Sequence, residues 1–60
     1  MTEEYERYIQ RHAAAAESAL FELRNALMGT GIGKCDQQAG AVEQMRLLCV
    51  GLAHEYGKGR

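Results

Sequence analysis

Three glycines at alternate positions, Gly29, Gly31 and Gly33, divide this chain into two segments of similar length. Glycine readily adopts positive φ and loses more conformational entropy in a helix than other residues, so the segment 29–33 is expected to form a turn. Neither flanking segment contains proline, and alanine, leucine, glutamate and arginine are common in both. Because these residues favour helix, the sequence predicts two helices joined by a short connection.

The first helix is expected over residues 3–28 and the second over about 35–56. Thr2 is a candidate N-cap for the first helix, and Asp36 is a candidate N-cap for the second. Residues 57–60 are expected to form a short basic tail. Because a short connection makes neighbouring helices antiparallel, the expected fold class is all-α, an antiparallel two-helix hairpin forming one domain over the 60 residues.

Each predicted helix has a stripe of mostly apolar residues at alternating spacings of three and four, which places them on one face. On the first helix the stripe is Glu6, Ile9, Ala13, Ala16, Leu20, Leu23 and Leu27. On the second it is Cys35, Gln38, Val42, Met45, Cys49, Leu52 and Tyr56. Apart from Glu6, Cys35 and Gln38, these residues are the predicted core between the helices.

The predicted core contains few large apolar side chains relative to the number of residues that folding must order. Ordering a residue costs roughly 1.5 kcal/mol, while burying a Leu or Ile side chain returns only about 1.5–3 kcal/mol. Further apolar side chains lie off the stripes, and a glycine within the second helix could admit another backbone closely. The sequence therefore predicts a protein partner, either a second copy that completes a four-helix bundle or a larger helical protein. The expected contact residues are Tyr8, Phe21, Met28, Leu47, Val50 and Gly51.

Composition excludes several other classes of protein. The chain has seven basic and eight acidic residues and a net charge of −1, which does not indicate a strongly basic nucleic-acid or membrane binder. No apolar run approaches the ~20 residues that span a bilayer. The N-terminus is acidic where a secretory signal would be basic. Two cysteines are too few for a disulfide scaffold, so the expected location is a reducing cytoplasm.

The sequence offers little to a catalytic or metal site. The segment 29–34 resembles a phosphate-binding loop, but Met28 stands where the motif needs glycine and Cys35 where it needs serine or threonine. Cys35 and Cys49 would lie about 21 Å apart on one helix. With His12 and His54 they bring at most three ligands together, and nothing supplies a fourth. We therefore expect no enzyme activity, no metal and no cofactor.

A second stripe on the first helix mixes basic, polar and aromatic residues: Arg7, Arg11, Ser18, Phe21 and Asn25. An exposed aromatic ring among arginines can stack on RNA bases while the guanidinium groups bind phosphates. Rop-like plasmid copy-number regulators, which are dimers of helical hairpins, read RNA through a comparable face. The likeness is confined to general architecture, and Glu22 interrupts the stripe here.

Two segments carry a resemblance to a known family. Residues 19–27, Ala-Leu-Phe-Glu-Leu-Arg-Asn-Ala-Leu, and residues 33–38, Gly-Lys-Cys-Asp-Gln-Gln, resemble the small type III secretion needle co-chaperone family (YscE/PscE type). The first segment matches in the spacing of its leucines, glutamate and arginine, and the second resembles that family's turn into its second helix. The resemblance implies a non-catalytic helical hairpin that binds a tetratricopeptide-like chaperone and helps to keep the needle subunit from polymerising.

The alternative is a small phage- or plasmid-encoded regulator that forms a homodimer and binds and inhibits a host protein. Its expected features are the same short length, the same lack of chemistry and the same surplus of apolar side chains. The two hypotheses differ in what covers the hairpin, a larger helical protein or a second copy.

Overall fold

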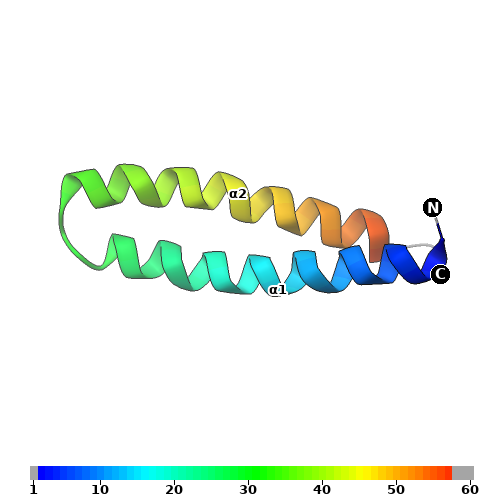
Figure 1. Ribbon diagram of the computed structural model, residues 1–60. Helices are drawn as coiled ribbons and strands as arrows, with labels where there is room; N and C mark the ends of the chain where they lie inside the picture. Colours follow the sequence, from blue (N-terminus) through cyan, green and yellow to red (C-terminus); the bar gives the residue numbers. More distant parts are fainter. Residues whose placement is uncertain (1, 58–60) are drawn as a thin grey trace.

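The structure, a computed structural model, describes residues 2–57 and contains two helices and no strand in that range. Helix α1 spans Glu3–Met28 and helix α2 spans Gly33–Gly57. The helices run antiparallel and lie side by side, as a helical hairpin (Figure 1). Helix α2 begins two residues before the expected start. Residues 58–60 of the expected basic tail lie outside the described residues.

The start of α1 is capped as the sequence predicts. The Thr2 hydroxyl oxygen accepts a hydrogen bond of 3.1 Å from the Tyr5 backbone N–H, and the Thr2 backbone is extended. The first turn is acidic, with Glu3, Glu4 and Glu6 close to the positive end of the helix dipole. A satisfied cap and favourable charge together explain why the helix begins here.

The connection between the helices depends on two residues, Thr30 and Gly31. The Thr30 hydroxyl donates to the Leu27 carbonyl oxygen at 2.9 Å and accepts from the Ile32 N–H at 3.2 Å. Gly31 has φ 72°, a value that favours glycine, whereas Gly29 keeps a right-handed conformation. The chain therefore reverses at Gly31 and not at the end of α1.

The prediction that Asp36 caps α2 is wrong. Its N–H donates to the Ile32 carbonyl oxygen at 3.1 Å, so Asp36 already lies within the first helical turn. Glycine at position 33 tolerates this earlier start, and the Asp36 carboxylate still lies where the helix dipole favours negative charge.

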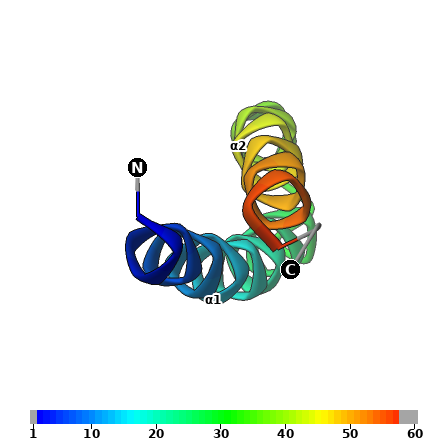
Figure 2. The same cartoon turned by 90° about the vertical axis from the view of Figure 1, so that its right-hand side faces the viewer.

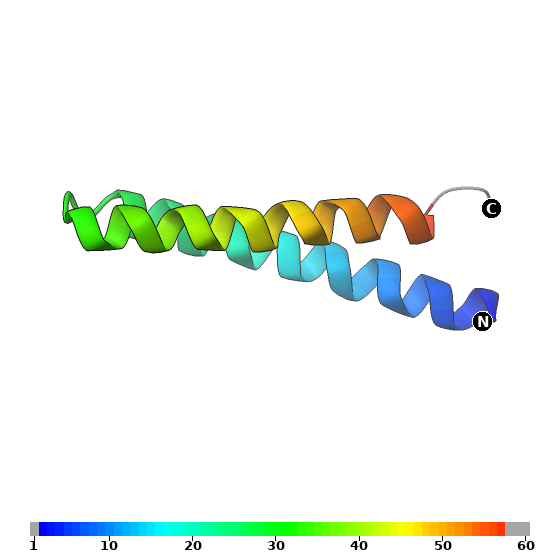
Figure 3. The same cartoon turned by 90° about the horizontal axis from the view of Figure 1, so that it is seen from above.

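Small side chains form the centre of the contact between the helices. Among the described residues only Ala13, Ala39 and Val42 are buried. The remaining predicted core residues on the inner side are half-buried: Ile9, Ala16, Leu20, Leu27, Cys49, Leu52 and Tyr56. The helices cross at an angle, so the N-terminal end of α1 projects to one side of α2 (Figures 2 and 3). A single hairpin thus buries little apolar bulk.

Two core predictions, Leu23 and Met45, are wrong for the single chain. Their side chains are 48% and 49% exposed. The next residue on each helix, Arg24 and Arg46, is half-buried instead and reaches across to a carboxylate on the other helix. Each helix is therefore turned slightly from the heptad prediction, because long arginine side chains can pack their carbon stems in the contact and still pair their charges.

Candidate binding faces

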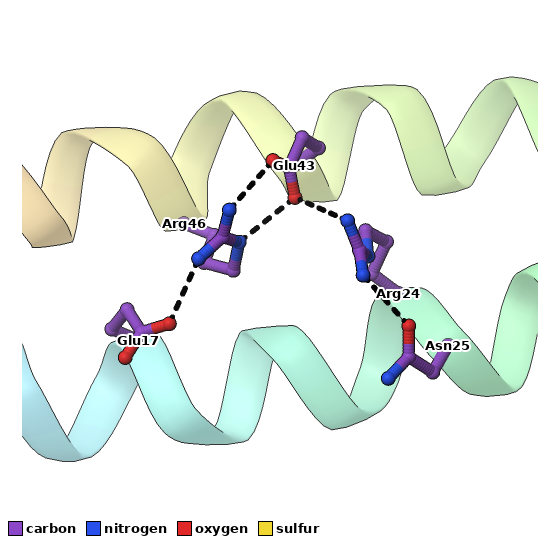
Figure 4. Close-up of polar contacts among 5 residues, drawn as sticks. All are labelled: Glu17, Arg24, Asn25, Glu43 and Arg46. Atoms are coloured by element: carbon purple, nitrogen blue, oxygen red, sulfur yellow. Dashed lines mark hydrogen bonds and ion pairs between the residues drawn. The ribbon is translucent and has the colours of Figure 1, made fainter.

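A cluster of charged side chains crosses one side of the contact between the helices (Figure 4). Arg46 on α2 donates to Glu17 on α1 at 3.0 Å and to both carboxylate oxygens of Glu43 at 2.7 and 2.8 Å. Arg24 on α1 donates to Glu43 at 3.1 Å and to the side-chain oxygen of Asn25 at 2.9 Å. Glu43 therefore links two arginines that come from different helices.

Phe21 completes this cluster. The guanidinium carbon of Arg24 lies 4.8 Å from the centre of the Phe21 ring, and that of Arg46 lies 5.6 Å from it. Both distances lie within the range of a cation–π interaction. The Arg24 Nε is enclosed and has no hydrogen-bond partner within residues 2–57. We call Glu17, Phe21, Arg24, Glu43 and Arg46 the polar cluster.

The cluster holds its charges firmly at neutral pH. The hydrogen bond from Arg46 lowers the pKa of Glu43 below its ordinary value of 4.5, and the positive charges of Arg46 and Arg24 add to this effect. The hydrogen bonds to Glu43 and Glu17 raise the pKa of Arg46. Both groups therefore stay ionised through the physiological pH range, and the cluster acts as a fixed polar contact between the helices.

Helix geometry places the polar cluster on one side of the hairpin and the exposed side chains of Leu23 and Met45 on the opposite side. Each residue advances about 100° around the helix axis. A residue four positions later is therefore displaced about 40° in one direction around the helix, and a residue three positions later is displaced about 60° in the opposite direction. Arg24 lies four residues after the inward-facing Leu20, whereas Leu23 lies three after it. On α2, Arg46 and Met45 have the same relation to Val42.

Because Arg24 and Arg46 both bind Glu43, their two sides coincide. Leu23 and Met45 consequently share the other side. The same spacings place Tyr5, Tyr8 and Ala19 of α1 there, together with Leu48 of α2. We call these six residues, Tyr5, Tyr8, Ala19, Leu23, Met45 and Leu48, the apolar face.

The apolar face lacks charged side chains over most of its length. From Tyr5 to Leu27 on α1, and from Gln37 to Leu52 on α2, no Asp, Glu, Lys or Arg occupies a position on this side. All five of its large side chains are exposed, and Leu48 is the most exposed of them at 63%. Toward the N-terminus the rings of Tyr5 and Tyr8 stack at 5.9 Å, and Tyr8 lies 4.3 Å from the His12 ring. His12 lies on the same side, seven residues after Tyr5 and seven before Ala19, so the face carries one histidine and is free of Asp, Glu, Lys and Arg over this length.

The residues that the sequence marked as partner contacts do not share one face. Tyr8 belongs to the apolar face. Met28, Leu47 and Val50 lie on the other side, because each follows a member of the polar cluster by four residues. Phe21 is itself in the cluster, and Gly51 points outward, with no atom within 4 Å of where a Cβ would be.

Sequence reasoning missed Tyr5 and Leu48 as surface residues. The available signal was spacing: Leu48 follows Met45 by three residues and precedes Leu52 by four, which puts all three on neighbouring positions of α2. What hid this relation was the assignment of Met45 to the inner contact. A helix with apolar residues on more than one face has several equally good stripes, and only the position of the neighbouring helix selects one.

The described residues contain no arrangement suited to a metal ion. Within residues 2–57, no three His, Cys, Asp or Glu side chains gather closely enough to coordinate one. Cys35 and Cys49 are free thiols and half-buried. Two open hollows lie along α1, one lined by Thr2, Glu4, Tyr5 and Tyr8 and the other by Glu4, Arg7, Gln10 and Arg11. Within the described part of the chain, neither helix has a stretch both long and apolar enough to cross a lipid bilayer.

The stripe considered for RNA is already engaged by its own chain at two points. Arg7 lies 3.8 Å from Glu3, with both side chains well exposed. The Phe21 ring is covered by two guanidinium groups, and carboxylates of Glu17 and Glu43 lie beside those groups. A base that stacked on this ring would have to displace an arginine, and a phosphate nearby would meet negative charge.

Comparison with protein-family models, with curated proteins and with solved structures found no match for this chain.

Proposed function

We propose that this protein is a non-catalytic binding module, and that another polypeptide covers its apolar face. One observation carries the proposal: large exposed side chains, Leu23, Met45 and Leu48 among them, form a surface without Asp, Glu, Lys or Arg beside a contact in which, within residues 2–57, only alanine and valine side chains are buried. Contiguous apolar surface of this kind marks sites of protein interaction. A small helical domain also needs such added burial for stability.

The apolar face suits a protein better than a nucleic acid. Protein interfaces have an apolar centre and are depleted in charge there, whereas nucleic-acid interfaces are rich in positive charge. Among residues 2–57, the one lysine or arginine on this side is Lys34, in the first turn of α2 and beyond the end of the apolar face, and the arginines of the polar cluster are paired with Glu17 and Glu43. RNA binding therefore takes second place.

Two roles use this face in the same way. A type III secretion needle co-chaperone would lay it against a larger helical chaperone, and the resemblance of residues 19–27 and 33–38 supports that role. A phage- or plasmid-encoded homodimeric regulator would lay it against a second copy and offer its other side to the host protein that it inhibits. Both roles require the face to be covered.

Adjacent leucines give this proposal a direct test. Leu47 and Leu48 are both exposed, but only Leu48 lies on the apolar face. A photoreactive amino acid is introduced at either position, and the chain is cross-linked in the cells that produce it. We expect a cross-linked polypeptide, of whatever identity, from position 48 and much less from position 47. No adduct at position 48, or equal adducts at both positions, would contradict the proposal.

A further inference from the structure

We infer that the polypeptide covering the apolar face is a second copy of this chain, related by a two-fold axis parallel to the helices. The product is a four-helix bundle with both turns at the same end. This inference rests on the proposed function, since it names what covers the face. Four features of the hairpin support it: its surface area, its charge pattern, the direction of its heptad stripes and the distribution of bulk along the face.

The surface area is too large for a compact monomer and suits a dimer. The chain exposes 4395 Å², whereas a folded monomer of 6.6 kDa is expected to expose roughly 3900 Å². The Cα envelope measures 44 × 14 × 13 Å, so one long side offers roughly 600 Å² before side chains enlarge it, near the ~800 Å² per partner of a stable interface. A matching hairpin therefore offers a contact at the lower end of the range for stable interfaces, about 600–1,000 Å² per partner.

The charge pattern permits the face to meet itself. A two-fold contact brings the same surface of each copy together, so charges near the axis would meet like charges. The apolar face has none between Tyr5 and Leu27 or between Gln37 and Leu52.

The heptad stripes point toward the centre of such a bundle. In a two-helix hairpin the stripe should face the neighbouring helix alone, but Leu23 and Met45 turn away from it, and both turn to the same side. In a four-helix bundle each stripe faces the common axis, which lies between the neighbouring helix of the hairpin and the second hairpin. Leu23 and Met45 would then be core residues of the dimer.

The two helices carry their bulk at different levels of the apolar face. The contacts Glu17–Arg46 and Arg24–Glu43 set which residues of α1 and α2 lie at the same height. At the height of Met45 and Leu48, α1 presents the small residues Ala16 and Ala19. At the height of Leu23, α2 presents Ala41. Large side chains of each helix thus lie level with alanines of the other helix.

This distribution selects the direction of the axis. A two-fold axis parallel to the helices lays α1 of one copy on α2 of the other at equal height, so Met45 and Leu48 fill the space over Ala16 and Ala19 of the second copy. Leu23 likewise packs over Ala41. An axis perpendicular to the helices would lay Leu48 near its own counterpart and alanine near alanine, leaving one side crowded and the other empty.

Light scattering on the purified chain tests the oligomeric state. We expect twice the 6.6 kDa chain mass for the wild type, and an unfolding temperature that rises with protein concentration. Leu48→Glu should give a monomer, or an unfolded chain if the hairpin cannot stand alone. Leu47→Glu, its neighbour outside the face, should remain a dimer. A wild-type monomer at micromolar concentration, or a Leu47→Glu monomer alongside a Leu48→Glu dimer, would overturn the inference.

A distance between the two turns tests the arrangement. Ile32 is exposed in the turn, so Ile32→Cys can carry a spin label after Cys35→Ser and Cys49→Ser remove the native thiols. With helices about 10 Å apart and both turns at one end, the labels should lie within roughly 30 Å. Turns at opposite ends would give a distance near the 44 Å length of the hairpin, and that result would exclude the parallel axis.

The outcomes separate this inference from the proposed function. A monomeric wild type that still cross-links from position 48 to a different protein would overturn the dimer and leave the proposed function standing. A monomer with no adduct from position 48 would overturn both. A dimer that is lost in Leu48→Glu and kept in Leu47→Glu supports both.

Discussion

Arg46 reaches from α2 to Glu17 on α1, and its guanidinium nitrogen lies 3.0 Å from the carboxylate oxygen. This ion pair, together with Arg24–Glu43, joins the two helices by charge. The side chains of both pairs are about one-quarter exposed. Fully exposed ion pairs contribute little to stability, and in fully buried pairs the cost of desolvation offsets the attraction, so these pairs lie between the two cases. Their geometry fixes the rotation of each helix about its axis.

Removing Arg46 should therefore destabilise the hairpin more than removing an exposed arginine. Arg46→Gln leaves the Glu17 and Glu43 carboxylates side by side with one cation fewer between them. Arg7→Gln is the matched control, because the Arg7–Glu3 pair is exposed and 3.8 Å long, and should change the free energy of unfolding by less than about 0.5 kcal/mol. Urea unfolding of both variants measures the difference. Equal effects would show that the polar cluster contributes no more than a surface pair.

The lowered pKa of Glu43 predicts loss of stability in acid. Because Glu43 binds protons less readily in the folded chain than its ordinary pKa of 4.5 implies, its contribution is present above that pH and is lost as the pH falls through the folded value. The free energy of unfolding, measured from pH 7 down to pH 3, should fall below about pH 4.5. Glu43→Gln should flatten this fall. An identical profile for the wild type and the variant would mean that other carboxylates cause it.

Phe21 should contribute to stability through its arginines. Phe21→Leu keeps apolar bulk and removes the ring, so the loss of the contact with Arg24 should cost about 0.5–1 kcal/mol. Because Phe21 lies on the side away from the apolar face, the mass in light scattering should not change. If association weakens while stability is unchanged, Phe21 belongs to a partner contact, as the sequence prediction had it.

The sequence predicts where the helices begin and end better than it predicts the rotation of each helix about its own axis. The bounds of α1, the Thr2 cap and the turn at alternating glycines all follow from local chemistry, which a short segment carries within itself. Local chemistry does not determine which side of each helix faces the other helix, because Leu20–Leu23 and Leu20–Arg24 are equally good helical spacings. Arg24 took the inner position through its pairing with Glu43, nineteen residues away, and such a distant partner is invisible to a periodicity argument.

The apolar face was predicted only in part for the same reason. The heptad spacing leaves Tyr8 outside the stripe, on the surface, but it assigns Leu23 and Met45 to the inner contact. If the hairpin forms the proposed bundle, the heptad assignment describes the dimer core. The single chain then differs from it only because half of that core is supplied by the second copy.

Gly31 should be the one turn position where alanine is harmful. Its φ of 72° is strained for a residue with a Cβ, although the space around it is open. We expect Gly31→Ala to lower the free energy of unfolding by about 1–2 kcal/mol. Gly33→Ala is the control, since Gly33 begins α2 with an ordinary φ and no atom near its Cβ position. Circular dichroism during urea unfolding compares them. Equal stability of both variants would show that the turn can reverse without a left-handed residue.

Gly40 and Gly51 should respond to alanine in the opposite direction. Both lie within α2, and no atom stands within 4 Å of where the new methyl group would be. Alanine in an exposed helix is favoured over glycine by about 1 kcal/mol, so Gly40→Ala and Gly51→Ala should each stabilise the chain by about that amount.

Gly51 is also a predicted partner contact, whereas Gly40 is not, so the two variants together test that prediction. If both variants gain stability and both keep their binding, Gly51 is an ordinary helix glycine. If Gly51→Ala alone weakens the capture of a second protein while its stability rises, a partner's backbone passes close to that position. That partner would lie on the outer side of α2, leaving the apolar face free for a second copy.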